Sequence, residues 1–170
     1  MDERLQYLLD RAEISDTVMR YFLALDRFDV DGVRNTLADE FTLDAGVLAA
    51  PPTAKPVDEF LDELVERNWG FVATMHMNPN HLVEIDGDSA QVTAYMFGSH
   101  IVGDAPEDCF WGYGTYTIDL VRLERGWRIT KLVISPMRSE GGDVGRIYAI
   151  AAQRQRDGQQ REGEHERGAA

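Results

Sequence analysis

Apolar residues recur at helical spacing in the first half of the chain and alternate with polar residues in the second. Residues 3–26 carry the longest helical pattern, with apolar positions at Leu5, Leu8, Leu9, Ala12, Val18, Phe22 and Leu25. Asp29 is a favourable N-cap and predicts a second helix that runs to about residue 38. A short strand is expected at residues 41–44 and a loop at residues 46–56. Pro56 suits the first turn of a third helix, which Trp69 and Gly70 end.

Alternation in the second half predicts antiparallel strands. Four segments show it: residues 81–86, 90–102, 110–123 and 127–135. The turn signal Asp-Gly-Asp at residues 86–88 joins the first two segments into a hairpin. Gly112 and Gly114 lie inside the third segment and indicate a bend or a bulge. Helices followed by long antiparallel strands predict one α+β domain, with helices on one face of a curved sheet.

The C-terminal part of the chain has a different character. Residues 142–154 place apolar side chains at helical spacing and predict a further helix. From residue 158 the composition is polar, which is typical of a disordered tail. We therefore expect a folded domain over residues 1–140, a C-terminal helix within 141–157 and a disordered tail at 158–170.

Charge and cysteine content argue against several classes of protein. The 170 residues carry a formal net charge of -13, whereas nucleic acid or an anionic membrane would require a basic surface. Cys109 is the single cysteine, which excludes an internal disulfide and a metal cluster built on thiolates. No apolar stretch approaches the roughly 20 residues that span a bilayer. We expect a cytoplasmic protein with neither nucleic acid nor membrane as a partner.

A carboxylate and a histidine form the strongest candidate for acid–base chemistry. Asp26 ends the first helix among Phe22, Leu25 and Phe28, where a carboxylate needs a partner. With His76 it could abstract a proton, because a carboxylate fixes the imidazole tautomer and stabilises the imidazolium. Each residue also has a structural interpretation, Asp26 as a helix-end cap and His76 as a core histidine bound to a backbone carbonyl. No local pattern links the two positions.

Two other histidines, His81 and His100, are further candidates for chemistry. His100 shares one strand face with Met96 and Gly98, and on a concave face it could protonate a leaving group. It is otherwise a polar strand position. His81 is expected to be exposed, and its spacing from His76 matches no metal-ligand signature, so we predict no metal site.

Aromatic side chains are the predicted lining of a substrate pocket. Core packing explains them equally simply, but an apolar pocket with a few hydroxyl donors also needs such residues. A tyrosine there could polarise a carbonyl or assist a leaving oxygen. The candidate substrate-binding residues are Tyr21, Phe22, Tyr95, Trp111, Tyr113 and Tyr116.

Three motifs occur in a recognisable order: LALDRFDVDGVRNTLADEFTLD, TMHMNPNHLVEIDGDSAQV and YGTYTIDLVRLERGWRITKL. Over residues 5–136 the chain resembles the SnoaL-like group of the nuclear-transport-factor-2 (NTF2) fold. The resemblance implies a cone, in which a curved mixed or antiparallel sheet wraps three helices from the N-terminal half around one deep pocket. Within the group, scytalone dehydratase and hexachlorocyclohexane dehydrochlorinase are most similar in motif. Asp26 and His76 match their Asp–His dyad, and His100 and Tyr95 are looser matches to a second histidine and a pocket tyrosine.

The resemblance implies a cofactor-independent lyase of the dehydratase type, acting on a small, largely apolar substrate. His76 would abstract a C–H proton, Asp26 would orient it, and His100 or a tyrosine would assist the departing oxygen. The resemblance also implies a homo-oligomer, a dimer or a trimer. The same fold hosts other functions. The alternatives are an isomerase or polyketide cyclase acting on a ketone, a non-catalytic module that binds a small ligand, and a small subunit like that of ring-hydroxylating dioxygenases.

Overall fold

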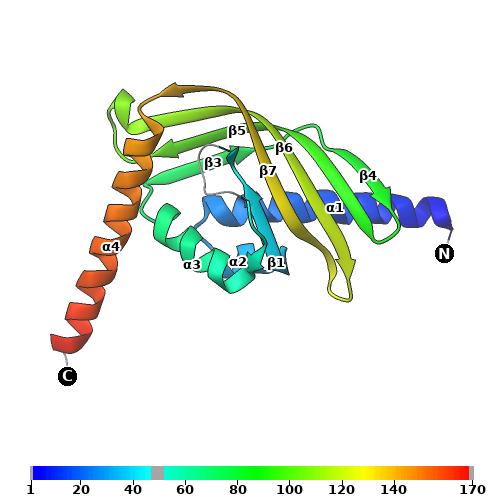
Figure 1. Cartoon of the computed structure of the whole chain (residues 1–170), viewed down its shortest axis with the longest axis horizontal. Helices are drawn as coiled ribbons and strands as arrows, with labels where there is room; N and C mark the ends of the chain where they lie inside the picture. The colour runs from blue at the N-terminus through cyan, green and yellow to red at the C-terminus, as the bar shows by residue number, and fades with distance from the viewer. Residues whose placement is uncertain (1, 47–51, 169–170) are drawn as a thin grey trace.

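A curved sheet arches over the N-terminal helices in the computed structural model (Figure 1). The structure describes residues 2–46 and 52–168, with side chains as far as residue 159. In this part of the chain the elements are α1 (Glu3–Asp26), α2 (Val30–Arg34), β1 (Leu37–Asp44), β2 (Lys55–Pro56), α3 (Val57–Asn68), β3 (Ala73–Met77), β4 (Leu82–Asp86), β5 (Ser89–Ile101), the 3-10 turn η2 (Pro106–Asp108), β6 (Cys109–Leu123), β7 (Gly126–Gly141) and α4 (Val144–Gly168). The α+β fold class is therefore confirmed.

The seven strands of the sheet follow the order β2-β1-β7-β6-β5-β3, and β4 pairs with β5 beyond the end of β3. Only the β1–β7 pairing is parallel among these strands, so the sheet is mixed. The register of β6 against β7 shifts between Tyr113 and Gly114. A Cβ on Gly114 would overlap the backbone carbonyl of Ser135, which explains the glycine and confirms the predicted bulge.

Helix α1 is continuous and supplies much of the main core. The side chain of Asp2 caps its N-terminus by accepting a hydrogen bond from the backbone N–H of Arg4. Its buried apolar residues come from the second half of the helix: Ile14, Val18, Tyr21, Phe22, Ala24 and Leu25. Leu5, Leu8 and Leu9 are half or more exposed, so the predicted apolar stripe is wrong over the first turns. The helix begins beyond the body of the sheet there.

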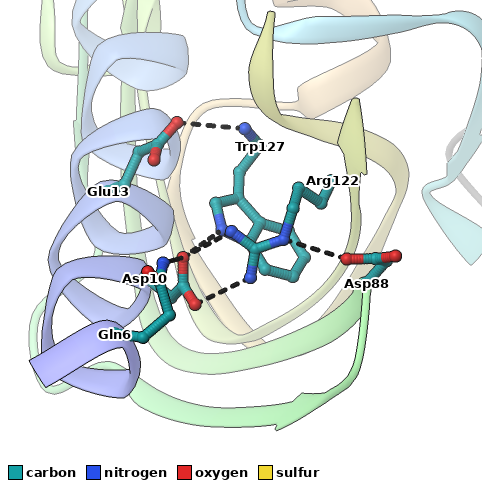
Figure 2. A network of polar contacts seen from close by, with 6 residues as sticks. All are labelled: Gln6, Asp10, Glu13, Asp88, Arg122 and Trp127. Atoms are coloured by element: carbon teal, nitrogen blue, oxygen red, sulfur yellow. Dashed lines mark hydrogen bonds and ion pairs between the residues drawn. The ribbon is translucent and has the colours of Figure 1, made fainter. Parts of the chain in front are cut away.

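A buried carboxylate anchors α1 to the sheet instead (Figure 2). Asp10 is 5 % exposed and accepts two hydrogen bonds from the Arg122 guanidinium, at 2.5 and 2.7 Å. The indole N–H of the buried Trp127 lies 3.3 Å from the same carboxylate. The hydrogen bond from Arg122 is the largest of the effects that lower the pKa of Asp10 to about 2, against an opposing effect of burial. Asp10 is therefore ionised and fully paired at neutral pH.

The chain after α1 differs in detail from the pattern-based expectation. Asp29 caps α2 as predicted, by accepting a hydrogen bond from the N–H of Gly32, but the helix ends at Arg34 rather than near residue 38. Buried Leu37 and Ala38 instead begin β1, whose parallel pairing with β7 overrides their helical spacing. Pro56 is the N-cap of α3 and not part of its first turn, so the helix begins at Val57, one residue later than expected. Pro56 also ends the two-residue strand β2. The predicted loop at 46–56 lies partly outside the described residues, which omit 47–51.

Helix α4 packs across one end of the sheet through a small separate core. Phe71, Val102 and Phe110 contact Ile147 and Ala151 of the helix. Gly70 allows this approach, because a Cβ at that position would overlap the carbonyl of Ala151. No helix in the described part of the chain combines the length and the apolar character needed to cross a membrane.

The backbone of α4 remains helical to Gly168, well past the predicted end at residue 154. A disordered tail was expected from residue 158, whereas the backbone of 158–168 continues α4; residues 169–170 lie outside the described part. The segment is polar but rich in helix-forming Gln, Arg and Glu. Side-chain pairs along the helix, such as Gln153 with Asp157 at 2.7 Å, add support.

Candidate active site

Asp26 and His76 lie in direct contact. Nδ1 of His76 is 2.7 Å from Oδ1 of Asp26, and the backbone N–H of His76 donates to Oδ2 at 2.8 Å. The hydroxyl of Thr74 donates to Oδ1 at 2.9 Å. An ionised carboxylate only accepts, so the proton of a neutral imidazole lies on Nδ1 and the lone pair on Nε2. This is the arrangement of a general base held by a carboxylate.

The sheet determines where the imidazole lies. Asp26 is the last residue of α1, whereas Thr74 and His76 are alternate residues of β3 and share its inner face. Antiparallel pairing places His76 opposite Gly98 of β5. A Cβ on Gly98 would lie 3.6 Å from Cδ2 of His76 and 3.9 Å from Nε2, so glycine leaves open space beside the ring. Nε2 has no hydrogen-bond partner among the described residues, and His76 lines a largely apolar cavity.

The environment keeps Asp26 charged. Its side chain is 17 % exposed, and burial by itself favours the neutral acid. The hydrogen bonds from His76, the positive charge of its ring in the protonated form, and the hydroxyl of Thr74 outweigh burial and lower the pKa of Asp26 below its usual value. An ionised Asp26 can therefore stabilise the imidazolium that forms when His76 takes up a proton.

His100 and Tyr148 form a second polar unit beside the first. The His100 ring lies 5.1 Å from the His76 ring, centroid to centroid, and its Nε2 is 3.1 Å from the hydroxyl of Tyr148. Burial first, and then the charge of His76, lower the pKa of His100 to about 3. His100 is therefore neutral at physiological pH. Burial also raises the pKa of Tyr148, so its hydroxyl keeps its proton.

A cavity of ≈ 350 Å³ contains these groups. The volume lies at the lower end of the range for small-molecule sites. Its walls are mainly apolar and come from α1, α3, the inner face of the sheet and α4. Three of the predicted substrate-binding residues line it: Tyr21, Phe22 and Tyr116. His76 and His100 line it as well, so the structure brings together five of the nine candidate residues at the cavity and places Asp26 directly behind His76.

Three predicted pocket residues lie elsewhere. Tyr95 is 60 % exposed, and neither Trp111 nor Tyr113 borders the cavity. Strand alternation explains the error, because these residues have the opposite parity to Met96 and Gly112, which do line the cavity. Tyr113 contacts Phe97 at 5.4 Å between ring centroids, on the outer face of the sheet. Tyr95, Trp111 and Tyr113 therefore do not line the cavity that holds His76 and His100, in contrast to the expectation.

Sequence reasoning missed several lining residues, notably Tyr148 and Arg67. Tyr148 lies within the apolar pattern of the predicted C-terminal helix, but that pattern does not reveal where the helix packs. Arg67 lies in the last turn of α3, where a basic residue also suits the helix dipole. The local sequence therefore gave no signal that either residue faces a cavity.

The remaining histidine has a separate environment. His81 is half-buried rather than exposed, because its Nδ1 is 2.7 Å from the hydroxyl of Ser15 on α1. Burial lowers its pKa. Among the described residues no group of three or more His, Cys, Asp or Glu side chains is arranged to hold a metal ion.

Comparison with known proteins identifies relatives at moderate similarity. Rv2910c, an uncharacterized protein of Mycobacterium tuberculosis, is 28% identical over 126 residues, which cover 73% of this chain and 83% of that protein. The crystal structure of Kfla4162 from Kribbella flavida superposes with a TM-score of 0.76 at 28% identity, covering 85% of this chain and 98% of that one.

Two solved structures with named activities share the fold at 16% identity. A type 2 hexachlorocyclohexane dehydrochlorinase (LinA) has a TM-score of 0.71 and covers 84% of this chain and 95% of its own. A Novosphingobium aromaticivorans protein provisionally assigned as a scytalone dehydratase has a TM-score of 0.69, covering 82% and 96%. These likenesses concern the NTF2-like cone. The SnoaL-like domain matches residues 6–133, which is most of the chain, and the protein therefore belongs to the SnoaL-like family.

Proposed function

We propose that this protein is a cofactor-independent lyase that removes a proton and a leaving group from a small, largely apolar substrate. The observation that carries the proposal is the 2.7 Å contact between Asp26 and Nδ1 of His76, with Nε2 at the cavity and without a hydrogen-bond partner among the described residues. Structural neighbours with the same cone include a dehydrochlorinase and proteins assigned as dehydratases. Both reactions are eliminations.

His76 acts as the base in the proposed mechanism. Nε2 takes a proton from a substrate carbon, and the C–H electron pair forms the new double bond as the leaving group departs. Asp26 stabilises the resulting imidazolium through the Nδ1 hydrogen bond. General acid–base assistance of this kind is worth roughly 100- to 10,000-fold in rate.

His100 and Tyr148 assist at the leaving group or at a carbonyl oxygen. Because His100 is neutral, it acts through hydrogen bonding rather than as a cation, and it orients the Tyr148 hydroxyl 3.1 Å away. The pair can then donate a hydrogen bond to an oxygen that gains negative charge. Their position beside His76 suits a substrate in which the oxygen lies two bonds from the carbon that loses its proton.

Isomerisation of a ketone is the second candidate reaction. The same base would abstract the proton, and the neutral His100–Tyr148 pair would stabilise an enolate, as neutral imidazole donors can. The proton would then return to another carbon with no group lost. The two reactions would use the same residues, His76 and the His100–Tyr148 pair, and would differ only in their products.

Proton abstraction can be tested before the substrate is known. We would incubate the protein in D2O with paired probes, β-hydroxy ketones and the same ketones without the hydroxyl, and follow the C–H signals by NMR. The wild type is expected to speed deuterium exchange, His76→Ala to abolish the effect, and Asp26→Asn to reduce it strongly. His81→Asn is the matched control, because His81 contacts Ser15 and does not line the cavity.

The products separate the possible functions. Vinyl signals from the hydroxy ketones indicate elimination, whereas exchange or double-bond migration without loss of hydroxide indicates isomerisation. Probes that bind without any exchange would indicate a non-catalytic binding module. Exchange that survives in His76→Ala would overturn the proposal.

A further inference from the structure

Arg67 is a cation inside an otherwise largely apolar cavity. It is half-buried at the end of α3 and lines the same cavity as His76 and His100. Its Nε donates to Oδ1 of Asn68 at 3.2 Å, which fixes the guanidinium plane. In the part of the chain with described side chains, neither terminal nitrogen has an acceptor and no carboxylate lies within 4.0 Å.

The charge of the cavity wall is opposite to that of the chain. The protein has 30 acidic and 17 basic side chains, yet no Asp or Glu is among the described residues that line the cavity. Arg138 also lines it, but it is paired with Glu140 at 3.0 Å and its side chain is 73 % exposed. Asp26 lies behind His76, with its acceptor positions used by Thr74 and His76. The unpaired positive charge is therefore that of Arg67.

This charge reaches the groups around the proposed chemistry. Burial raises the pKa of Tyr21 and Tyr148, and the charge of Arg67 opposes this in both. Burial and His76 lower the pKa of His100, and Arg67 acts in the same direction. These three residues come from α1, α4 and β5, so Arg67 acts across the cavity. A partly desolvated arginine with no carboxylate partner among the described side chains is costly unless a ligand supplies the anion.

We propose that the substrate carries a carboxylate and that the two terminal nitrogens of Arg67 bind it. The inference rests on the proposed function of this cavity and narrows its substrate class to small apolar acids with one carboxylate group. The planar fork of a guanidinium matches a carboxylate in two parallel hydrogen bonds. With the carboxylate held at α3, the apolar part of the substrate extends towards His76 and His100. Arg67 thereby determines specificity and does not take part in proton transfer.

The test compares 2-naphthoate with 2-naphthamide, which have nearly the same shape and differ in charge at neutral pH. Binding would be measured by isothermal titration calorimetry to the full chain. The wild type is expected to bind 2-naphthoate about tenfold to a hundredfold more tightly, the range for a charge-assisted hydrogen-bonded pair. Arg67→Gln is expected to remove this preference, and Arg67→Lys to retain part of it. Arg138→Gln is the matched control and is expected to keep it.

His76→Ala separates this inference from the proposed reaction. It is expected to lose deuterium exchange while still preferring 2-naphthoate, because the base and the carboxylate site are different groups. A co-crystal structure of the wild type should place the carboxylate within about 3 Å of the Arg67 terminal nitrogens. The inference is overturned if the wild type shows no preference or does not bind 2-naphthoate, if the preference survives in Arg67→Gln, or if the carboxylate lies elsewhere.

Discussion

Replacement of Asp26 by Asn tests the dyad with little change in shape. The carboxylate accepts three hydrogen bonds, from the backbone N–H and Nδ1 of His76 and from the hydroxyl of Thr74. An amide has one acceptor oxygen and one donor nitrogen, so it cannot accept hydrogen bonds both from the backbone N–H and from Nδ1 of His76. If the oxygen stays with the backbone N–H, the NH₂ group faces Nδ1 and selects the tautomer with the proton on Nε2. That tautomer has no lone pair at the cavity.

The expected loss of rate follows from these contacts. A charge-assisted hydrogen bond is worth about 1.5–3 kcal/mol, which is about 10- to 150-fold in the stability of the imidazolium. The change of tautomer slows the reaction by roughly a further tenfold, because the hydrogen bond from the Asn side-chain NH₂ to Nδ1 favours the inactive tautomer by about 1.4 kcal/mol. We therefore expect Asp26→Asn to slow proton abstraction by about 100- to 1,000-fold.

Three measurements check this reasoning. The rate of deuterium exchange into a ketone gives the loss directly, and thermal unfolding shows that the variant is folded. The ¹⁵N chemical shifts of the His76 ring report the tautomer with no substrate present, and they should change from Nδ1–H to Nε2–H. A variant within about threefold of the wild type, or a wild type that already carries the proton on Nε2, would refute the role assigned to Asp26.

Three other predictions concern stability and the second polar unit. Asp10→Asn should lower the free energy of urea unfolding by about 2–4 kcal/mol, because it breaks a buried ion pair with Arg122. Asp88 contacts the same arginine but its side chain is 79% exposed, so Asp88→Asn should lower the free energy of unfolding by under about 1 kcal/mol. Because folding lowers the pKa of Asp10 from 3.8 to about 2, its contribution is complete above about pH 5 and is lost progressively between about pH 5 and pH 1. Equal acid sensitivity of the wild type and Asp10→Asn would contradict this assignment. Tyr148→Phe should slow elimination about tenfold and leave deuterium exchange nearly unchanged, and equal loss of both would exclude a role at the leaving group. Gly70→Ala should lower the free energy of unfolding by about 1–3 kcal/mol, because its Cβ would overlap the backbone of α4. Gly158→Ala lies within α4 and has open space around it, so it should raise the free energy of unfolding by up to about 1 kcal/mol.

The fold class was predictable because long-range features left local signals. The Asp86 to Asp88 turn, the alternation of β5 and β6 and the glycine bulge all appear in the sequence within a few residues of where they act. Strand parity also placed His100, Met96 and Gly98 on one face, and the structure places all three at the cavity. The face of a strand on which a side chain lies follows from a period of two, and the sequence displays this period directly.

The site was harder to predict because β3 reverses the usual pattern. Its apolar residues Ala73, Met75 and Met77 are exposed, whereas Thr74 and His76 face inward. A strand with polar residues inside lacks the alternation that marks a core-facing element, and it is the strand that brings His76 to Asp26. The same ambiguity affected Tyr95, since aromatic residues suit either face of a strand.

Helix α4 lies outside the part of the chain that matches the SnoaL-like family, whereas Asp26 and His76 lie inside it. The SnoaL-like match ends at residue 133, but Val144 and Tyr148 of the cavity wall come after it, on a helix with its own small core. Changes in that helix can therefore reshape the wall without disturbing the packing around Asp26 and His76. Exchange of this one terminal segment would therefore change the shape of the cavity wall, while the contact between Asp26 and His76 stays in place.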